Sequence, residues 1–518
     1  MEDLKNIPKE KFEFADRGDI SHDKKFDTKP IGYFKDAWLR FCKNKASVVA
    51  SIIIVIIILY ALITPLCGIP EFMDTYYARM APRNIALSSI GIAQGGATND
   101  YNERTLILNY SLGIAAEDAD GSGEITWEEG LDSYYQPVLK IKGSTRNSGS
   151  TVYTVKVDSY LAVGFLYRSI PQSEYADIVA WQEETGLQVL FPLIANNEYT
   201  LDSSNANYWY KMVTRGTPVQ IVHGREETIS LNDLETGQAQ LEDNYLRDEN
   251  GDPVYYQYTG GGTTETAQYR VRVLYYNYYV YQHGFEPQYL FGTDTQGYDL
   301  ALRMARGIQL SLLVAICVSV LNLVLGAVYG AIEGYYGGVI DLTMERIADI
   351  LSGVPFIVVA TLFQIHLAAQ VGAIPSLLFA FVMTGWISTA ARTRTQFYRF
   401  KNSEYVLAAR TLGARDRRII WKHIFPNSLG TIITSSVLVI PNVIFSESML
   451  SFLGIVNLGG STMTSLGTLL SDAASIWTRY PHLMIFPAVV ISLLMICFNL
   501  FGNGLRDAFN PSLRGVEE

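Results

Sequence analysis

Cysteine is scarce in this sequence, and a phosphate-binding loop is absent. Four cysteines occur in 518 residues, and none lies between residues 68 and 300. That polar stretch therefore has no disulfide framework and needs a packed core, for which it is long enough. No GxxxxGK[ST] motif is present, so we predict no ATP site in this chain and no enzymatic activity of its own. The net charge of −11 argues against nucleic-acid binding.

Long hydrophobic runs are absent from residues 68–290, but they occur on both sides of that stretch. The run Ser47–Leu66 is close to the ~20 residues that cross a bilayer. Two lysines precede it and two acidic residues follow it, which predicts a cytoplasmic N-terminus. These flanking residues are Lys43, Lys45, Glu71 and Asp74.

Five further apolar spans are predicted after residue 290, so that six spans return the C-terminus to the cytoplasm. Glycine and proline are expected to interrupt two of them, at Gly353–Pro355 and at Pro441. Between the last two spans, Ser465–Ala473 is predicted to form a short re-entrant helix surrounded by protein or by a water-filled path. The spans are expected at Ile308–Ile332, Ala348–Leu367, Leu377–Thr395, Leu429–Ile455 and Met484–Phe501.

Residues 68–290 are predicted to form one globular α+β domain on the outer side of the membrane. Thr151–Val157 alternates like a strand, as does part of Gln268–Tyr281. Ser173–Thr185 is typical of a helix that Gly186 ends. The many tyrosines suit half-buried strands, and binding of a partner or peptide is the alternative.

A calcium-binding loop is predicted within this domain. Asp118–Glu129 (DADGSGEITWEE) fits the twelve-residue EF-hand pattern, with Gly123 at the turn position. A single such loop favours a structural Ca²⁺, and an acidic surface turn without an ion is the alternative. The expected ligands at positions one, three, five, seven, nine and twelve are Asp118, Asp120, Ser122, Glu124, Thr126 and Glu129.

A basic helical hairpin is predicted at Glu404–Pro426, between the fourth and fifth of the six spans. Tyr405, Val406, Ala409 and Leu412 recur at helical spacing. Gly413 then suits a left-handed turn, and Asp416 can cap a second helix. Because Arg410, Arg415, Arg417, Arg418 and Lys422 outnumber the acidic residues, the hairpin should face the cytoplasm.

This hairpin resembles the EAA loop of ABC importer permeases. The resemblance is carried by Glu404, Ala408, Ala409, Gly413 and the sequence Ile424–Pro426. It implies that the hairpin is the coupling helix that docks in a cleft of an ATPase subunit, with Glu404, Ala408, Ala409, Arg410, Gly413, Arg417 and Pro426 at the contact. A helix that lies on anionic lipid headgroups is the alternative interpretation.

The resemblance extends over residues 291–514 and the first span, and it is closest to the C-type permeases of the dipeptide/oligopeptide branch. FGTDTQGYDLALRMARG, from Phe291, resembles the segment that enters the second span. The sequence departs from the family at Tyr298 and Gln309, where arginine is usual, and at Leu466, where tryptophan is usual.

The resemblance implies a type I ABC importer permease with six transmembrane helices and the α+β domain inserted after the first. It further implies a second homologous permease, two ATP-binding ABC subunits and an extracellular or lipid-anchored peptide-binding protein as partners. Dipeptides or oligopeptides would be the cargo, although related permeases import nickel complexes and other solutes. The chain would be a multi-pass protein of a bacterial cell membrane, in contact with lipid.

Polar residues inside the spans are candidates for the translocation path, because ionisable and polar groups at membrane depth are commonly functional. These candidates are Gln364, His366, Asn442, Glu447 and Ser448. Glu447 lies near the outer end of its span, where reaching water is its alternative role. Pro441 and Asn442 together also fit a simple helix kink.

The predicted organisation is therefore a series of segments along the chain. The segments are cytoplasmic residues 1–46, a transmembrane helix at 47–67, the extracellular domain at 68–290, a permease core at 291–510 with the coupling hairpin at 401–426, and a cytoplasmic tail at 511–518.

A membrane-anchored calcium-binding receptor or adhesion protein is the alternative function, because the calcium loop and the large α+β domain also suit it.

Overall fold

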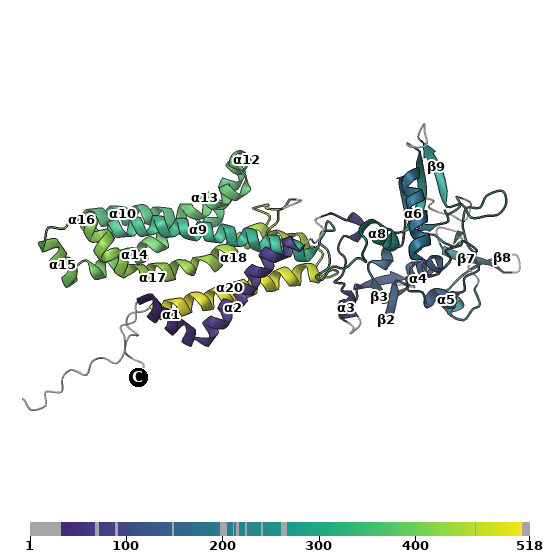
Figure 1. Cartoon of the computed structure of the whole chain (residues 1–518), viewed down its shortest axis with the longest axis horizontal. Coiled ribbons are helices and arrows are strands. Elements are labelled where there is room, and N and C mark those ends of the chain that lie inside the picture. The colour runs from purple at the N-terminus through teal and green to yellow at the C-terminus, as the bar shows by residue number, and fades with distance from the viewer. Residues whose placement is uncertain are drawn as a thin grey trace, which may run out of the picture.

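The computed structural model shows an elongated bundle of helices with an α+β domain at one end (Figure 1). We call the bundle the helical region. The short helices of the basic hairpin lie at the end of the bundle that is farthest from the α+β domain. The residues described are 33–509 except 68–71, 89–91, 148–149, 197–204, 211, 214–216, 223–224, 240–241, 261–266 and 461–462. Most of the predicted N-terminal segment, the tail at 511–518 and Gly261–Gly262 therefore lie outside the described residues.

In the described part of the helical region, five helical stretches are long and apolar enough to cross a membrane. A bent pair of helices adds a sixth. The helices are α1 (Tyr33–Lys43), α2 (Lys45–Ile63), α9 (Leu300–Tyr336), α10 (Gly338–Ser352), α11 (Phe356–His366), α12 (Ala368–Val371), α13 (Ala373–Gly385), α14 (Ile387–Phe400), α15 (Glu404–Thr411), α16 (Asp416–Arg418), α17 (Phe425–Val437), α18 (Val439–Phe452), α19 (Leu466–Ala473) and α20 (His482–Phe509).

The two predicted breaks are present, and one is displaced. α10 and α11 meet at an angle of 73° across Gly353–Pro355. The break expected at Pro441 instead lies at Leu438, because α17 ends at Val437 and Pro441 falls inside α18. A proline has no N–H to bond the carbonyl four residues earlier, which is that of Val437, so the helix is interrupted before the proline and not at it.

Helices α9 and α14 pack closely against each other, and glycine makes this contact possible. Gly326, Gly330 and Gly334 recur every four residues on α9 and so share one face. A Cβ at Gly330 would lie 2.2 Å from the carbonyl oxygen of Ala390 on α14. Such small-residue stripes let helix backbones approach closely in membrane proteins.

The described part of the α+β domain contains three antiparallel sheets with strand orders β1-β3-β2, β4-β10-β5 and β6-β7-β8, and β9 also pairs with β10. The strands are β1 (Gly96–Asn102), β2 (Val138–Asn147), β3 (Ser150–Asp158), β4 (Phe165–Pro171), β5 (Leu190–Phe191), β6 (Met212–Val213), β7 (Thr217–Val222), β8 (Arg225–Thr228), β9 (Tyr256–Gly260) and β10 (Gln268–Leu274). The helices are α3 (Ile85–Ser88), α4 (Glu103–Glu117), α5 (Trp127–Leu131), α6 (Gln172–Thr185), α7 (Leu231–Glu235) and α8 (Tyr275–His283).

Three local predictions in this domain are confirmed, the last of them with its end now located. The strand expected at Thr151–Val157 lies within β3, and the helix expected at Ser173–Thr185 lies within α6. The strand expected in Gln268–Tyr281 ends at Leu274, where α8 begins. Tyr275–Tyr279 are buried, so tertiary packing outweighs the strand preference of tyrosine here.

Buried tyrosines form much of this core. Tyr77 and Tyr160 are fully buried with ring centroids 5.2 Å apart. The Tyr160 hydroxyl donates to the carbonyl of Ala81 at 2.8 Å, and the Tyr275 hydroxyl donates to Asp74 at 2.7 Å. Burial raises the pKa of Tyr160 well above its ordinary value. Tyr160 and Tyr275 are therefore structural, because their rings are packed and their hydroxyl groups have partners.

Candidate functional site

The basic hairpin comprises α15, α16, a π-helical turn at Ile419–Ile424 and the start of α17. Its buried side chains are Val406, Ile419, Ile420 and Ile424. They pack against Ala331 and Tyr335 of α9 and Phe397 of α14. The hairpin is thus fixed to the end of the helical region by an apolar contact.

The first helix of the hairpin does not bury the whole apolar stripe that the sequence predicts. Val406 is buried, but Tyr405 is 39% exposed and Leu412 is 88% exposed. Leu412 lies beyond the end of α15, next to the turn at Gly413. An apolar side chain this exposed at the tip of a hairpin is available to a partner.

Gly413 adopts the left-handed conformation that the sequence predicts, with φ of +78°. The amide of Gly413 donates to the carbonyl of Arg410 at 3.0 Å, and the amide of Ala414 donates to that of Ala409 at 3.0 Å. A Cβ at Gly413 would meet nothing within 4 Å. Glycine is therefore favoured by backbone conformation and not by lack of space.

Asp416 does not cap the second helix as predicted. Arg415 occupies the N-cap position without a side-chain cap, and Asp416 is the first residue of α16. The Asp416 carboxylate instead accepts a hydrogen bond of 2.6 Å from the Tyr335 hydroxyl, which also lies 3.4 Å from the Arg410 guanidinium. A side chain from α9, distant in sequence, thus links both arms of the hairpin.

The surface of the hairpin is basic. Arg415, Arg417, Arg418, Trp421 and Lys422 line a groove on it. Six of the seven residues predicted to contact an ATPase are exposed, and the seventh, Ala409, is half-buried. The exposed six are Glu404, Ala408, Arg410, Gly413, Arg417 and Pro426.

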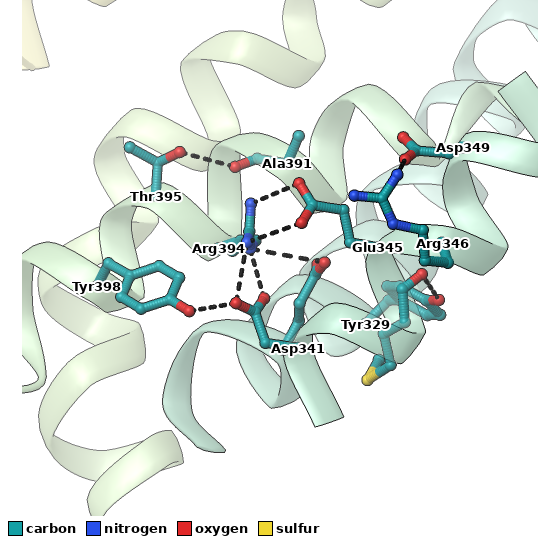
Figure 2. Close-up of polar contacts among 11 residues, drawn as sticks. Tyr329, Asp341, Glu345, Arg346, Asp349, Ala391, Arg394, Thr395 and Tyr398 are labelled. Atoms are coloured by element: carbon teal, nitrogen blue, oxygen red, sulfur yellow. Dashed lines mark hydrogen bonds and ion pairs between the residues drawn. The ribbon is translucent and has the colours of Figure 1, made fainter. Parts of the chain in front are cut away.

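A charge cluster joins α9, α10 and α14 and was not predicted from the sequence (Figure 2). The guanidinium of Arg394 on α14 contacts Asp341 at 2.6 Å and Glu345 at 3.0 Å, both on α10, and lies 3.6 Å from Glu333 on α9. Tyr398 donates a hydrogen bond to Asp341. One cation thus joins three helices. Asp341 and Glu345 are four residues apart, which signals a shared helix face, but nothing local identifies Arg394 as their partner.

The calcium loop adopts part of the expected geometry. The buried Asp118 carboxylate accepts from the Gly123 amide at 3.0 Å and from the Ser122 hydroxyl at 3.1 Å. Asp120 accepts from the Ser122 amide at 3.1 Å. Burial raises the pKa of Asp118, whereas the Ser122 amide lowers the pKa of Asp120.

The twelfth position of this loop has a different partner. The Glu129 carboxylate accepts from the Thr126 amide at 2.9 Å, which lowers its pKa, and thereby completes a capping box at the start of α5. Among the described residues, no three acidic, histidine or cysteine side chains converge as a metal site. Glu129 would have to leave Thr126 to join Asp118 around an ion. The side chain of Glu124 belongs to no such cluster. The predicted ligand from Glu124 is its backbone carbonyl oxygen.

Arg247 and Asp243 lie against the calcium loop and were not predicted. The Arg247 guanidinium donates to the Gly121 carbonyl at 3.0 Å and pairs with Asp243 at 3.2 Å. A Cβ at Gly123 would lie 2.4 Å from Asp243. The loop is therefore braced by a segment more than a hundred residues away in sequence.

The candidates for the translocation path do not form one group. Glu447 and Ser448 are buried in α18, and Glu447 does not reach water as its position near the helix end suggested. His366 and Asn442 are exposed. Gln364 is half-buried and donates to the Ala373 carbonyl at 3.0 Å. The structure therefore separates the buried pair from the other three.

The three residues that depart from the family pattern are each packed or hydrogen-bonded in the structure. The ring of Tyr298 lies under the guanidinium of Arg303, which pairs with Asp294 at 3.1 Å. Gln309 donates to the Ala61 carbonyl at 2.6 Å, and Leu466 is fully buried.

Two family models match this chain. Residues 326–515 match the binding-protein-dependent transport system inner membrane component, and residues 32–82 match the N-terminal transmembrane domain of oligopeptide transport permease C. Neither match includes residues 83–325, which hold most of the α+β domain.

Curated relatives agree with these matches. The chain is 41% identical to the oligopeptide transport system permease protein OppC of Bacillus subtilis, over 43% of this chain and 72% of the relative. It is 40% identical to the dipeptide transport system permease protein DppC of the same species, over 43% of this chain and 69% of the relative. A solved structure of the MetNI methionine ABC transporter is similar at 16% identity and a TM-score of 0.34, over 40% of this chain and 96% of that chain.

Proposed function

Because the chain belongs to the oligopeptide and dipeptide permease family of ABC importers, we propose that it forms half of the translocation pathway of an ATP-driven peptide importer. The chain is a multi-pass permease of the bacterial cell membrane, and ATP hydrolysis belongs to separate subunits. The second half of the pathway is a homologous permease. An extracellular binding protein delivers the peptide, and closure of two ATPase subunits drives transport.

The basic hairpin is proposed to couple this chain to an ATPase subunit. The observation that carries this proposal is the exposed tip of the hairpin, with Leu412 at 88% exposure beside a groove of arginines. The tip lies at the opposite end of the helical region from the α+β domain (Figure 1). This arrangement supports a cytoplasmic hairpin and an extracellular α+β domain.

The first experiment is a pull-down of the tagged chain in mild detergent, with mass spectrometry and an ATPase assay on the eluate. We expect a second permease, two ATPase subunits and ATPase activity that peptide-loaded binding protein stimulates. Recovery of the chain alone, under conditions that preserve other ABC complexes, would contradict the importer and favour the membrane-anchored calcium-binding receptor.

The coupling role itself is tested by substitutions in the hairpin. Gly413→Val and Glu404→Ala should abolish substrate-stimulated ATPase activity while membrane insertion remains normal. Gly413→Asn is the matched control, because asparagine tolerates the left-handed conformation better than other residues. Tyr335→Phe removes the hydrogen bond to Asp416 and should lower stimulation partially. Normal stimulation in Gly413→Val and Glu404→Ala would refute the coupling assignment.

We also propose that Asp118–Glu129 binds one Ca²⁺ as a structural ion of the α+β domain. The contact between the Asp118 carboxylate and the Gly123 amide, and the start of α5 at Trp127, support this proposal. Bound Ca²⁺ would take Glu129 as its bidentate ligand in place of the Thr126 cap. Isothermal titration of the full-length chain should show one site that Asp118→Asn removes and that Glu128→Gln, outside the ligand set, retains. Equal heats for both variants would exclude the site.

A further inference from the structure

Glu447 is a buried acidic side chain in the helical region, and the coupling mechanism does not use it. It is 1% exposed. The Ser311 hydroxyl of α9 donates to one of its oxygens at 2.9 Å, and the Ser451 hydroxyl donates to the other at 3.1 Å. The Ser448 hydroxyl lies 3.5 Å away. A lone carboxylate at membrane depth is costly unless positive charge or strong hydrogen bonds compensate it.

More hydroxyl groups extend this cluster onto α19. Ser465 caps that helix, and its hydroxyl lies 3.5 Å from that of Ser451 and 3.1 Å from that of Thr468. Hydroxyl oxygens of α9 and α18 thus contact the carboxylate, and those at the start of α19 extend the cluster through Ser451. We call Glu447 and these hydroxyls the oxygen cage. Its hydroxyl residues, all buried, are Ser311, Ser448, Ser451, Ser465 and Thr468.

No described contact supplies a positive charge to Glu447, because its hydrogen-bond partners are all hydroxyl groups. Arg303 on α9 pairs with Asp294, and Asp472 on α19 interacts with those same two residues. None of the titratable groups on the helices packed around α18 is seen to hydrogen-bond Glu447 in the described part of the chain. These groups are Arg303, Arg306, Cys317, Tyr329, Glu333, Tyr335 and Tyr336 on α9, Asp472 on α19, and His482, Cys497, Arg506 and Asp507 on α20.

The chemistry of the cage indicates the kind of ion that would complete it. Its donors are all oxygen atoms, which suit hard cations and not transition metals. A single carboxylate balances a single positive charge. Among the described residues, no three acidic, histidine or cysteine side chains converge here, so the second negative charge that would favour a divalent ion is lacking.

We propose that the oxygen cage binds one small monovalent cation, a proton or a sodium ion, and that the bound cation locks α9, α18 and α19 together. The cation would neutralise Glu447 and orient the hydroxyls from the three helices toward one point. Glu447 and Ser448 would then hold the packing of the re-entrant α19 in place, and they would not line the pathway that peptides follow.

Thermal unfolding of the purified full-length chain in detergent tests this proposal. Tryptophan fluorescence is followed at pH 6 and pH 8.5, in sodium chloride or in N-methyl-D-glucamine chloride of equal ionic strength. A sodium site predicts that sodium raises the unfolding midpoint of the wild type at pH 8.5, since a ligand that binds only the folded state stabilises it. A proton site predicts a midpoint that falls between pH 6 and pH 8.5 regardless of sodium.

Glu447→Gln keeps the shape of the side chain and removes its charge, so both responses should disappear in this variant. Asp472→Asn is the matched control and should retain the wild-type response. Ser451→Ala, which keeps the carboxylate, should raise the sodium concentration for half-maximal effect about tenfold, or weaken the pH response if the ligand is a proton. If Glu447→Gln folds, the proposal is overturned when this variant and the wild type respond alike to both sodium and pH. If Glu447→Gln does not fold, the proposal is overturned when Ser451→Ala responds like the wild type.

Discussion

Two regions of this protein bring their elements together in opposite ways. One is the glycine-lined contact between α9 and α14, which we call the glycine seam, and the other is the tyrosine core of the α+β domain. At the seam, glycines let two backbones approach so closely that a Cβ at Gly330 would overlap Ala390. In the α+β domain, large aromatic side chains such as Tyr77 and Tyr160 fill the space between elements.

The difference follows from the solvent around each region. Helices in lipid gain little from burying apolar surface, so close backbone contact and van der Waals packing dominate. A domain in water gains about 25 cal/mol for each Å² of apolar surface removed from solvent, which favours large rings. The same contrast holds for buried charge, because Arg272 of the α+β domain lies on the ring of Phe165, whereas Glu447 lies among small hydroxyls.

The largest effect should come from filling the glycine seam. Gly330→Leu places a side chain where the Ala390 carbonyl lies, and should cost about 3 kcal/mol or more by overpacking. We expect loss of the folded chain in size-exclusion chromatography after detergent extraction. Gly353→Leu is the control, because a Cβ there would lie 3.4 Å or more from its neighbours and the backbone φ of −69° suits any residue. Normal folding of Gly330→Leu would show that the seam is not closely packed.

Removing the buried arginine should be the next most severe change. Arg272 is fully buried, donates to the carbonyls of Ala206 and Pro192, and lies 3.8 Å from the Phe165 ring centroid. Arg272→Met leaves both carbonyls without that donor and should lower the free energy of unfolding by about 2–5 kcal/mol. Urea unfolding followed by near-UV circular dichroism of the tyrosines measures this loss.

Arg270→Met is the control for Arg272, because Arg270 lies on the same strand but is only half-buried over the ring of Tyr167. It should cost less than about 1 kcal/mol. Equal losses for the two variants would mean that burial of the guanidinium does not decide its contribution.

The charge cluster at the end of the helical region should give a smaller effect. Arg394→Gln leaves Asp341, Glu345 and Glu333 facing one another without their cation (Figure 2). Because the Arg394 side chain is 26% exposed, we expect a loss of about 1–3 kcal/mol, less than for a buried pair. The second change Asp341→Asn should restore part of it in thermal unfolding, whereas Arg346→Gln, in an exposed pair, should cost under about 1 kcal/mol.

The smallest effect should be a pH response of the α+β domain. His283 stacks on Phe72 with ring centroids 4.4 Å apart, and burial lowers its pKa. The unfolded chain therefore binds the proton more readily, so stability is complete above the ordinary histidine pKa of about 6.5 and is lost as the pH falls through the lower folded value. His283→Phe should flatten the unfolding midpoint between pH 7 and pH 5. An unchanged slope would assign the response to another group.

Local sequence signals determined much of this protein. The length of the apolar runs placed the spans, Gly413 placed the hairpin turn, and Gly186 placed the end of α6, because each depends only on neighbouring residues. The residues of the EAA-like loop also identified the family, which the comparisons confirm.

Only the tertiary structure decided which distant groups meet. Asp416 bonds Tyr335 instead of capping its own helix, Tyr275–Tyr279 form a helix within a shared aromatic core, and Arg394 joins three helices. Glu447 also finds Ser311 more than a hundred residues away. Such contacts form because a buried polar group must find a partner wherever the fold brings one, and sequence spacing carries no record of that choice.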